Sequence, residues 1–381
     1  MSAMRAYLDH NATSPLRPQA LEAMIRAMAD VGNASSVHAE GRHARLSVRN
    51  ARESVAGLVG ASADMVIFTS GGTEANNLAL RGAIDGGLGG RLLVSAIEHP
   101  SVLNPAALAG VPSGVIPVDG DGRLDLGALD TLLARDDRKA LVSVMLANNE
   151  TGAIQPMAEI ADMVHSHGGL VHCDAIQAAG RIALKWSVLG VDMLSLSAHK
   201  LGGPQGVGAL IVKPGLKLHP QTAGGAQENY RRAGTENVAG LAGFAAAITA
   251  SLKGLEDMAS IADERDRIET AIRKTSPAAC IFSKHADRLV NTSCFAVSGL
   301  DAQMLLIALD LDGVAVSSGS ACSSGKVARS HVLDAMGVEP GLSESAIRVS
   351  LGWSTTQGDT DRFIAAWRRI LARNGTFVAA A

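Results

Sequence analysis

The sequence predicts an α/β fold, with a large domain built on a mostly parallel β-sheet and a smaller α+β domain. Between residues 65 and 212, short runs of Val, Ile, Leu and Met alternate with helical patterns. Strands that are apolar along their whole length are typical of parallel sheets with helices on both faces. Beyond residue 274, a strand, a helix, a second strand and a last helix follow, which indicates the smaller domain.

The expected elements follow from these runs in chain order. A long Ala-rich, charged helical stretch at 237–274 separates the two groups of strands, and the glycine-rich segment 86–90 is expected to be a surface loop. Strands of the large domain are predicted over 65–69, 92–94, 141–145, 170–173, 192–197 and 208–212. The smaller domain is predicted to contain strands over 290–297 and 347–351 and helices over 302–309 and 360–371.

The composition indicates a globular protein that acts on a small ligand. Of its 381 residues 47% are hydrophobic, which is enough for a sizeable core. The 34 basic and 37 acidic residues give a formal net charge of -3 without a long run of one sign, so nothing favours nucleic acid or a membrane surface as a partner. No apolar stretch is long enough for a membrane span and no signal or transit peptide is recognisable, so we expect a cytoplasmic protein.

The cysteines are Cys173, Cys280, Cys294 and Cys322. Their wide spacing fits reduced thiols better than disulfides or a zinc site. Cys322 lies among small residues at 317–325, with Lys326 and Arg329 nearby, and this environment suits a mobile, accessible thiolate. The alternative is a loop cysteine without a function. The other three lie in strand-like apolar runs and are expected to be inert core residues.

Lys200 is the first candidate catalytic residue. It follows an apolar run that ends near Ser197 and precedes a glycine-rich turn at 202–204. Partial burial there would lower the pKa of the amine and free it to attack a carbonyl carbon, as Schiff-base lysines do. The alternative is a surface lysine at the end of a strand.

A candidate phosphate site lies in the segment 69–76, between a strand and the helical run at 77–80. Backbone N–H groups at a helix N-terminus, together with the Thr73 hydroxyl, suit a phosphate. The segment is neither a Walker A loop nor a dinucleotide-binding fingerprint. An ordinary capped helix start is the alternative.

Three further polar side chains stand in or beside apolar strands. Asp174 ends a buried strand, where a carboxylate needs a cationic partner such as a pyridinium nitrogen, unless it caps a helix or forms a structural ion pair. His99 could stack on a planar ring or move protons, or it could cap a helix. Arg348 suits the capture of a carboxylate, or a structural salt bridge.

Together these candidates describe a pyridoxal phosphate site, with a lysine nucleophile, a phosphate cup, an acid for the pyridinium, a histidine for the ring and an arginine for a carboxylate. The combination is far more specific than any member of it. No metal site is expected, since His165 and His167 would face different directions on a predicted helix.

The chain resembles the cysteine desulfurases, which are class V aminotransferase-like enzymes of the fold-type I pyridoxal phosphate group. The motifs that carry the resemblance lie at 7–13, 32–38, 69–77, 98–99, 148–152, 174–177, 197–200, 232–235, 317–322 and 347–352. The resemblance runs nearly from end to end. It implies a seven-stranded sheet in a large domain of residues 13–255, and a small domain of residues 1–12 and 256–381 that carries the Cys322 loop.

The resemblance also implies a role for each site residue. Lys200 would carry the cofactor as a Schiff base, Asp174 would pair with the ring nitrogen, and His99 would stack on the ring. The phosphate-binding residues would be Gly72, Thr73, Ser197 and His199, joined by the partner subunit's Thr235, so a homodimer is implied. Those at the ring hydroxyl would be Gln177 and Asn149, and those at the substrate carboxylate would be Asn11, Asn149 and Arg348.

The implied reaction converts L-cysteine to L-alanine. Lys200 would remove the α-proton, the Cys322 thiolate would take the substrate sulfur as a persulfide, and His99 would carry a proton. The sulfur would pass to an acceptor such as an iron-sulfur scaffold protein, and Cys322 could bind an iron-sulfur cluster transiently. The spacing from Cys322 to Ser330 is similar to that of the long-loop group, of the nitrogen-fixation type.

Two alternatives stay open. A selenocysteine lyase or another class V enzyme would use the same cofactor, although Cys322 argues against this. A regulatory protein that has lost catalysis would not need Lys200, Asp174 and Cys322 intact. The segment 224–232 departs from the usual family pattern Gly-Gly-Gly-(Gln/His)-Glu-Arg-Gly, so the chain differs from the family near the phosphate site.

Overall fold

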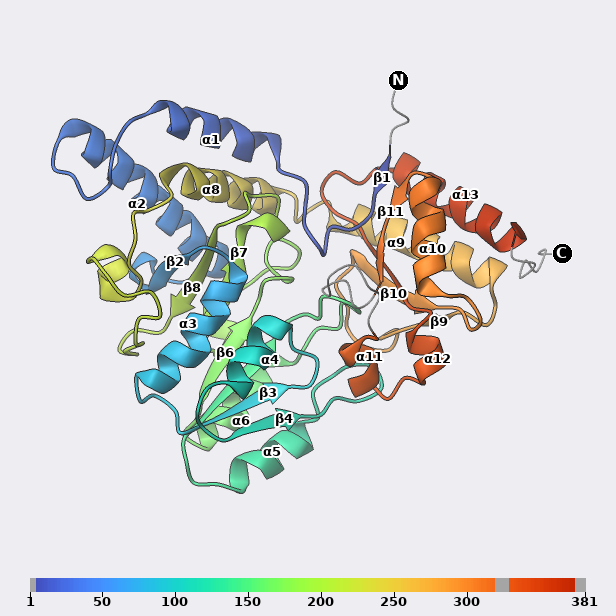
Figure 1. Ribbon diagram of the computed structural model, residues 1–381, viewed down its shortest axis with the longest axis horizontal. Coiled ribbons are helices and arrows are strands. Elements are labelled where there is room, and N and C mark those ends of the chain that lie inside the picture. Colours follow the sequence, from blue (N-terminus) through green and yellow to red (C-terminus); the bar gives the residue numbers. More distant parts are fainter. Residues whose placement is uncertain (1–4, 319–328, 374–381) are drawn as a thin grey trace.

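The computed structural model describes residues 5–318 and 329–373. A seven-stranded sheet forms the centre of the large domain (Figure 1). Its strands are β2 (Val66–Thr69), β3 (Arg91–Ser95), β4 (Ser113–Ile116), β5 (Ala140–Met145), β6 (Leu170–Asp174), β7 (Met193–Ser197) and β8 (Gly208–Val212). Their order is β2-β8-β7-β6-β5-β3-β4. Strand β8 runs in the opposite direction to the other six strands of this sheet. The predicted fold class is therefore confirmed.

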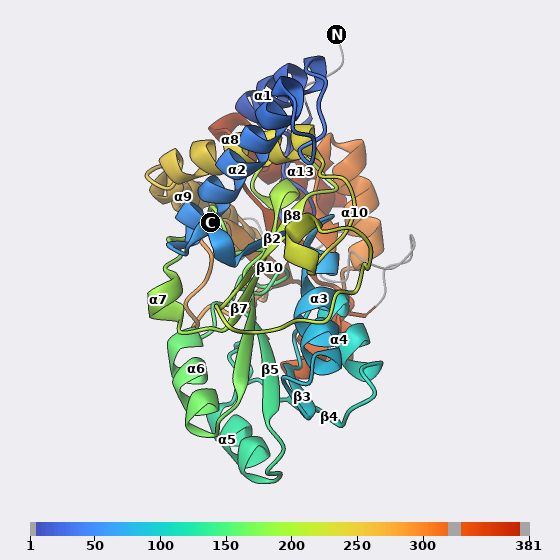
Figure 2. The same cartoon turned by 90° about the vertical axis from the view of Figure 1, so that its left-hand side faces the viewer.

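Apart from edge strand β4, alternate residues of each strand fill two separate cores, one on each face of the sheet. In β5, Val142 and Val144 belong to one core and Leu141 to the other. The first face is covered by α2 (Ala39–Val59), α5 (Leu126–Ala134), α6 (Met157–Ser166) and α8 (Val238–Lys253), and the second by α3 (Gly72–Asp85) and α4 (Pro100–Ala107). Figure 2 shows α5 and α6 on one side of the sheet and α3 and α4 on the other. Two covered faces explain why these strands are apolar throughout.

The smaller unit is built on an antiparallel sheet. Its strands, in the order β12-β13-β10-β9, are β12 (Ser317–Ser318), β13 (Ile347–Ser350), β10 (Thr292–Ala296) and β9 (Cys280–Ile281). Beside it, β1 (Ala6–Tyr7) pairs in parallel with β11 (Val314–Ala315). The helices are α9 (Met258–Thr275), α10 (Ala302–Leu311), α11 (His331–Ala335), α12 (Pro340–Ser343) and α13 (Gln357–Arg373). Trp367 is fully buried at the centre of this core and contacts Phe295 edge-to-face at 5.5 Å between ring centroids.

The single helical stretch predicted over 237–274 is wrong, because the chain forms α8 and α9 with a bend of 77° between them. The two helices bury their apolar faces in different cores. Phe244 of α8 packs on the large sheet, whereas Ile268 of α9 packs in the smaller unit. Ala-rich composition alone could not reveal that change of packing partner.

Strand β4 was also not predicted. It lies at the edge of the sheet, and only Ile116 of its four residues is buried. An exposed edge strand lacks the continuous apolar run that marked the others. Within residues 5–318 and 329–373, no single helix has both the length and the apolar character needed to cross a membrane; α8 and α9 meet that test only as a bent pair.

Candidate active site

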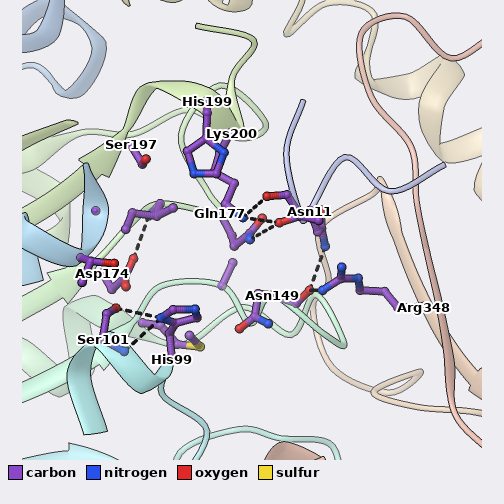
Figure 3. A pocket seen from close by; sticks show the side chains of 16 residues that line it. Asn11, His99, Ser101, Asn149, Asp174, Gln177, Ser197, His199, Lys200 and Arg348 are labelled. Carbon is purple, nitrogen blue, oxygen red and sulfur yellow. Dashed lines mark hydrogen bonds between the residues drawn. The ribbon is translucent and has the colours of Figure 1, made fainter. Parts of the chain in front are cut away.

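A cavity of about 340 Å³ lies beyond the ends of β5, β6 and β7, next to the smaller unit (Figure 3). Ligand sites of α/β sheets lie at the carboxyl ends of the strands. The predicted site residues that line this cavity are Asn11, Gly72, Thr73, His99, Asn149, Asp174, Gln177, Ser197, His199, Lys200 and Arg348. Thr235 instead lines a smaller cavity of about 120 Å³ with Glu228 and Arg232. Cys322 lies outside the described residues.

Lys200 is held at the wall of the cavity by the N-terminal segment. It lies in a short 3₁₀ turn, Ala198–Lys200, directly after β7. Its Nζ donates to the carbonyl oxygens of Asn11 and Ala12, the latter at 2.7 Å. The lysine is therefore part of the cavity, and the alternative of a simple surface lysine does not hold.

The Asp174 carboxylate is buried at the end of β6. Its Oδ2 accepts from Asn76 Nδ2 at 2.8 Å, and its Oδ1 accepts from the Ile176 N–H at 3.0 Å. Burial raises the pKa of Asp174, although these hydrogen bonds and the nearby His99 and Lys200 act in the opposite direction. The protein alone thus leaves the negative charge under-compensated, and a cationic group in the cavity would stabilise it.

The start of α3 forms a corner suited to an anion. The first helical residue is Gly72, and a Cβ at this position would lie 2.1 Å from Ile176 Cδ1, so only glycine fits without displacing Ile176. Ser197 Oγ is buried beside it and has no hydrogen-bond partner among the described residues. A helix N-terminus and an unpaired hydroxyl together match the needs of a phosphate.

His199 closes the same side of the cavity. Its Nδ1 lies 3.1 Å from Thr13 Oγ1. Burial, together with Lys200 and Arg181, lowers the pKa of His199 to about 4. The ring is therefore neutral at physiological pH, and it can offer one N–H to a ligand.

Arg348 and Asn11 define the opposite side. Arg348, which is 3% exposed, donates from Nη2 to Asp9 Oδ1 at 2.8 Å and from Nη1 to the Asn149 carbonyl at 3.1 Å. Its Nε has no partner within the described parts of the chain. Asn11 Nδ2 donates to the same Asn149 carbonyl at 3.0 Å. The structural salt bridge considered as an alternative for Arg348 is real, and it positions the guanidinium at the cavity.

His99 caps a helix, as one of its two predicted alternatives had it, and it also lines the cavity. It is the N-cap of α4, and its Nδ1 accepts from the Ser101 N–H at 3.1 Å. Burial lowers the pKa of His99; Lys200 and His331 add to this effect, and Asp174 opposes it. The imidazole therefore lies at the cavity in its neutral form.

Several residues of this site were not singled out from the sequence. Asn76, Ser101 and Glu150 are buried polar side chains that hydrogen-bond around the cavity or beside it. Ser101 had a usable signal, because it stands two residues after His99 at a helix start, where side chains and N–H groups exchange hydrogen bonds. No local sequence pattern pointed to Glu150, because its hydrogen-bond partner Ser330 is far away in the sequence.

The remaining described histidines and cysteines that were considered in the sequence lie outside the cavity. His165 Nε2 lies 2.8 Å from Asp192 Oδ2, and His167 Nε2 lies 3.0 Å from Asp130 Oδ1. No cluster of three or more potential metal ligands occurs among residues 5–318 and 329–373. Cys173 and Cys294 are buried as predicted, but Cys280 lies in the short edge strand β9 and is partly exposed, so its prediction as a core residue is wrong.

The chain is similar to known proteins along nearly its whole length. The family model for class V aminotransferases matches residues 6–363. A cysteine desulfurase of Cereibacter sphaeroides is 43% identical over 367 residues, which cover 94% of each chain. The structure of a NifS-like protein from Rickettsia africae has a TM-score of 0.90 and 36% identity, covering 97% of this chain and 99% of that one.

A further solved structure is that of SspA in complex with cysteine. It has a TM-score of 0.80 and 27% identity, covering 92% of this chain and all of the other, 100%. The family match, the identity over nearly full length and the shared fold agree with one another. The chain therefore belongs to the aminotransferase class V family, among its cysteine desulfurases.

Proposed function

We propose that this chain uses pyridoxal phosphate to convert L-cysteine to L-alanine and retains the sulfur on Cys322. The observation that carries the proposal is the single cavity in which Lys200, Asp174 and Arg348 meet (Figure 3). The relative solved in complex with cysteine supports the choice of substrate. The role of Cys322 rests on the family resemblance and on its sequence environment.

The residues of the cavity fit the cofactor. Ser197 Oγ lacks a partner in the described structure, and Gly72, Thr73 and His199 line the same cavity, where they could contact a phosphate. Asp174 would pair with the ring nitrogen, Lys200 would hold the carbonyl carbon, and His99 would lie on the ring. Gln177 and Asn149 would contact the ring hydroxyl. When bound, pyridoxal phosphate supplies an electrophilic carbonyl carbon and a ring that withdraws electrons from the substrate α-carbon.

The side chains of the protein would bind the substrate and transfer the protons and the sulfur. Arg348, Asn11 and Asn149 would hold the substrate carboxylate, and Lys200 Nζ would take the α-proton. The Cys322 thiolate would form the new S–S bond while the substrate C–S bond breaks, with its electron pair moving to the carbon side. His99 would deliver a proton, and the carbon skeleton would leave as alanine. In balance, L-cysteine and the Cys322 thiol become L-alanine and a Cys322 persulfide.

The proposal includes a homodimer, in which the partner subunit's Thr235 completes the phosphate site. Its support is the position of Thr235 outside the main cavity and the family resemblance. The persulfide would pass to an acceptor protein such as an iron-sulfur scaffold. The proposed compartment is the cytoplasm, where thiols stay reduced.

The test is to give the purified protein L-cysteine without a reductant, quantify alanine, and map added sulfur by peptide mass. Alanine and one extra sulfur on Cys322 are expected, and both should be lost in Cys322→Ala. The matched control is Cys280→Ala, which removes a partly exposed thiol in β9 and should change neither product. Alanine formation that persists in Cys322→Ala would indicate a lyase that releases sulfur directly and would overturn the role of Cys322.

A further inference from the structure

A chain of buried hydrogen bonds joins His99 to Asp174 through Ser101 and Asn76. Ser101 Oγ lies 2.8 Å from His99 Nδ1 (Figure 3). Asn76 Nδ2 lies 2.9 Å from Ser101 Oγ and 2.8 Å from Asp174 Oδ2. Asn76 is completely buried and Ser101 is 8% exposed, so water does not compete with these contacts.

The direction of each hydrogen bond follows from groups that can act in only one way. The Ser101 backbone N–H can only donate, and it points at His99 Nδ1 over 3.1 Å, so Nδ1 carries no proton. An ionised Asp174 can only accept, so Asn76 turns its amide nitrogen toward it. The second N–H of Asn76 then reaches Ser101 Oγ, which leaves the Ser101 hydroxyl hydrogen for His99 Nδ1.

With Asp174 ionised, the reverse orientation of the Asn76 amide is excluded by the same contacts. It would place Oδ1 against the Asp174 carboxylate, where two acceptors repel each other. In the orientation present, Asn76 Oδ1 has no partner among the described residues. Both N–H groups of Asn76 are therefore paired, one with Asp174 and one with Ser101, whereas its Oδ1 is not paired with any described residue.

We propose that Ser101 and Asn76 are positioning residues that hold His99 as the neutral imidazole with its proton on Nε2, and so set it to donate a proton before it accepts one. This inference rests on the proposed function, in which His99 delivers a proton to the carbon skeleton. Figure 3 shows the other ring nitrogen of His99 turned away from Ser101.

Protonation of His99 would disturb this arrangement. A second ring N–H, at Nδ1, would face the Ser101 N–H, and two donors cannot pair. The titratable groups around the ring are Asp174, Lys200 and His331, and His331 Nε2 itself lies 2.9 Å from the carbonyl oxygen of the neighbouring Glu98. Of these groups, only Asp174 favours the imidazolium, and burial opposes it.

The experiment measures the tautomer and the pKa of His99 directly. Long-range proton–nitrogen NMR spectra of histidine-labelled, cofactor-loaded enzyme would be recorded across pH for the unmodified chain, Ser101→Ala and Ser101→Thr. The His99 signal is assigned by its loss in His99→Gln. We expect the proton on Nε2 in the unmodified chain. Ser101→Ala removes one of two donors to Nδ1, so the pKa of His99 should rise by about one unit, and Ser101→Thr, which keeps the hydroxyl, should restore it.

A proton on Nδ1 in the unmodified enzyme would overturn the proposal. This measurement does not depend on whether any variant folds. An unchanged pKa in Ser101→Ala would overturn the role of Ser101. Alanine production from L-cysteine by the unmodified enzyme is measured in parallel. If alanine is absent while the proton is on Nε2, the proposed function fails and the assignment of the tautomer stands.

Discussion

At the scale of single residues, the site side chains each serve the fold and the cavity at once. His99 caps α4, and Arg348 pairs with Asp9, yet both line the cavity. Each was predicted with a structural and a functional alternative; the structural contact is present in both cases, and the functional role stays a prediction. A side chain locked by a structural contact is held in the orientation that its chemistry needs.

Arg348→Lys tests the substrate carboxylate site. Lysine would lose the fork of guanidinium donors, and a lost charge-assisted contact costs about 1.5–3 kcal/mol. The KM for L-cysteine should therefore rise roughly ten- to hundredfold, while the absorbance of the bound cofactor stays the same. Steady-state kinetics measure this. The control is Arg369→Lys, an exposed partner of Asp312, and an unchanged KM in Arg348→Lys would contradict the assignment.

At the scale of elements, the turn after β5 is linked to the start of α11. The Ser330 hydroxyl, at the N-cap of α11, donates to Glu150 Oε2 at 2.5 Å. Burial raises the pKa of Glu150 to about 7, although Ser330 and Arg348 act against this shift. The carboxyl group thus joins the large domain to the segment that follows residue 328; the hydrogen bond from Ser330 favours its ionised form, whereas burial favours its protonated form.

Glu150→Gln tests this link through the pH dependence of stability. The pKa of Glu150 is about 7 in the folded chain and 4.5 when unperturbed, so between these values the folded state binds more protons than the unfolded one. The contribution of Glu150 is therefore full below pH 4.5 and is lost as the pH rises to 7. Over that window the variant should gain up to about 3 kcal/mol relative to the unmodified chain.

Urea denaturation at several pH values measures this difference in the free energy of unfolding. The control is Glu344→Gln, which changes an exposed carboxylate and should show a difference that does not vary with pH. A constant difference between Glu150→Gln and the unmodified chain would mean that Glu150 does not titrate in this range.

At the scale of the whole molecule, the large domain exposes apolar side chains along α1 (Pro18–Ala29) and the segment after it. Ile25 is 58% exposed, Met28 65% and Val31 81%. Figure 1 shows α1 on the outer side of the large domain, with α8 beneath it. Exposed apolar side chains grouped in this way are typical of an interface. Because α1 packs on α8, which begins shortly after Thr235, we assign this surface to the second copy of the chain in the proposed homodimer.

The double variant Ile25→Asp with Met28→Asp should convert the dimer to a monomer, because two carboxylates cannot be buried there without partners. Sedimentation velocity measures the change. The matched control carries Met304→Asp and Leu311→Asp on α10, where the side chains are 65% and 81% exposed, and it should stay dimeric. A dimer in the α1 variant would contradict the assignment of this surface.

The sequence alone was sufficient for the fold class and for most of the cavity wall. Buried strands are apolar on both sides, and residues such as Lys200 and Asp174 directly follow or end such strands, so local pattern locates them. Edge strand β4 and the bend between α8 and α9 were not predicted. The exposure of a strand at a sheet edge, and the core on which a helix packs, have little effect on the local sequence pattern.

What only the tertiary structure decided are the contacts between distant segments. The pairing of Asn11 with Lys200, of Asp9 with Arg348 and of Ser330 with Glu150 joins residues far apart in the chain. The sequence could propose a histidine near a ring, but not the direction of the Ser101 hydroxyl toward its Nδ1, because that depends on the Asn76 amide brought in by α3. Residue types determine which chemistry is available, and long-range packing determines the direction in which each hydrogen bond points.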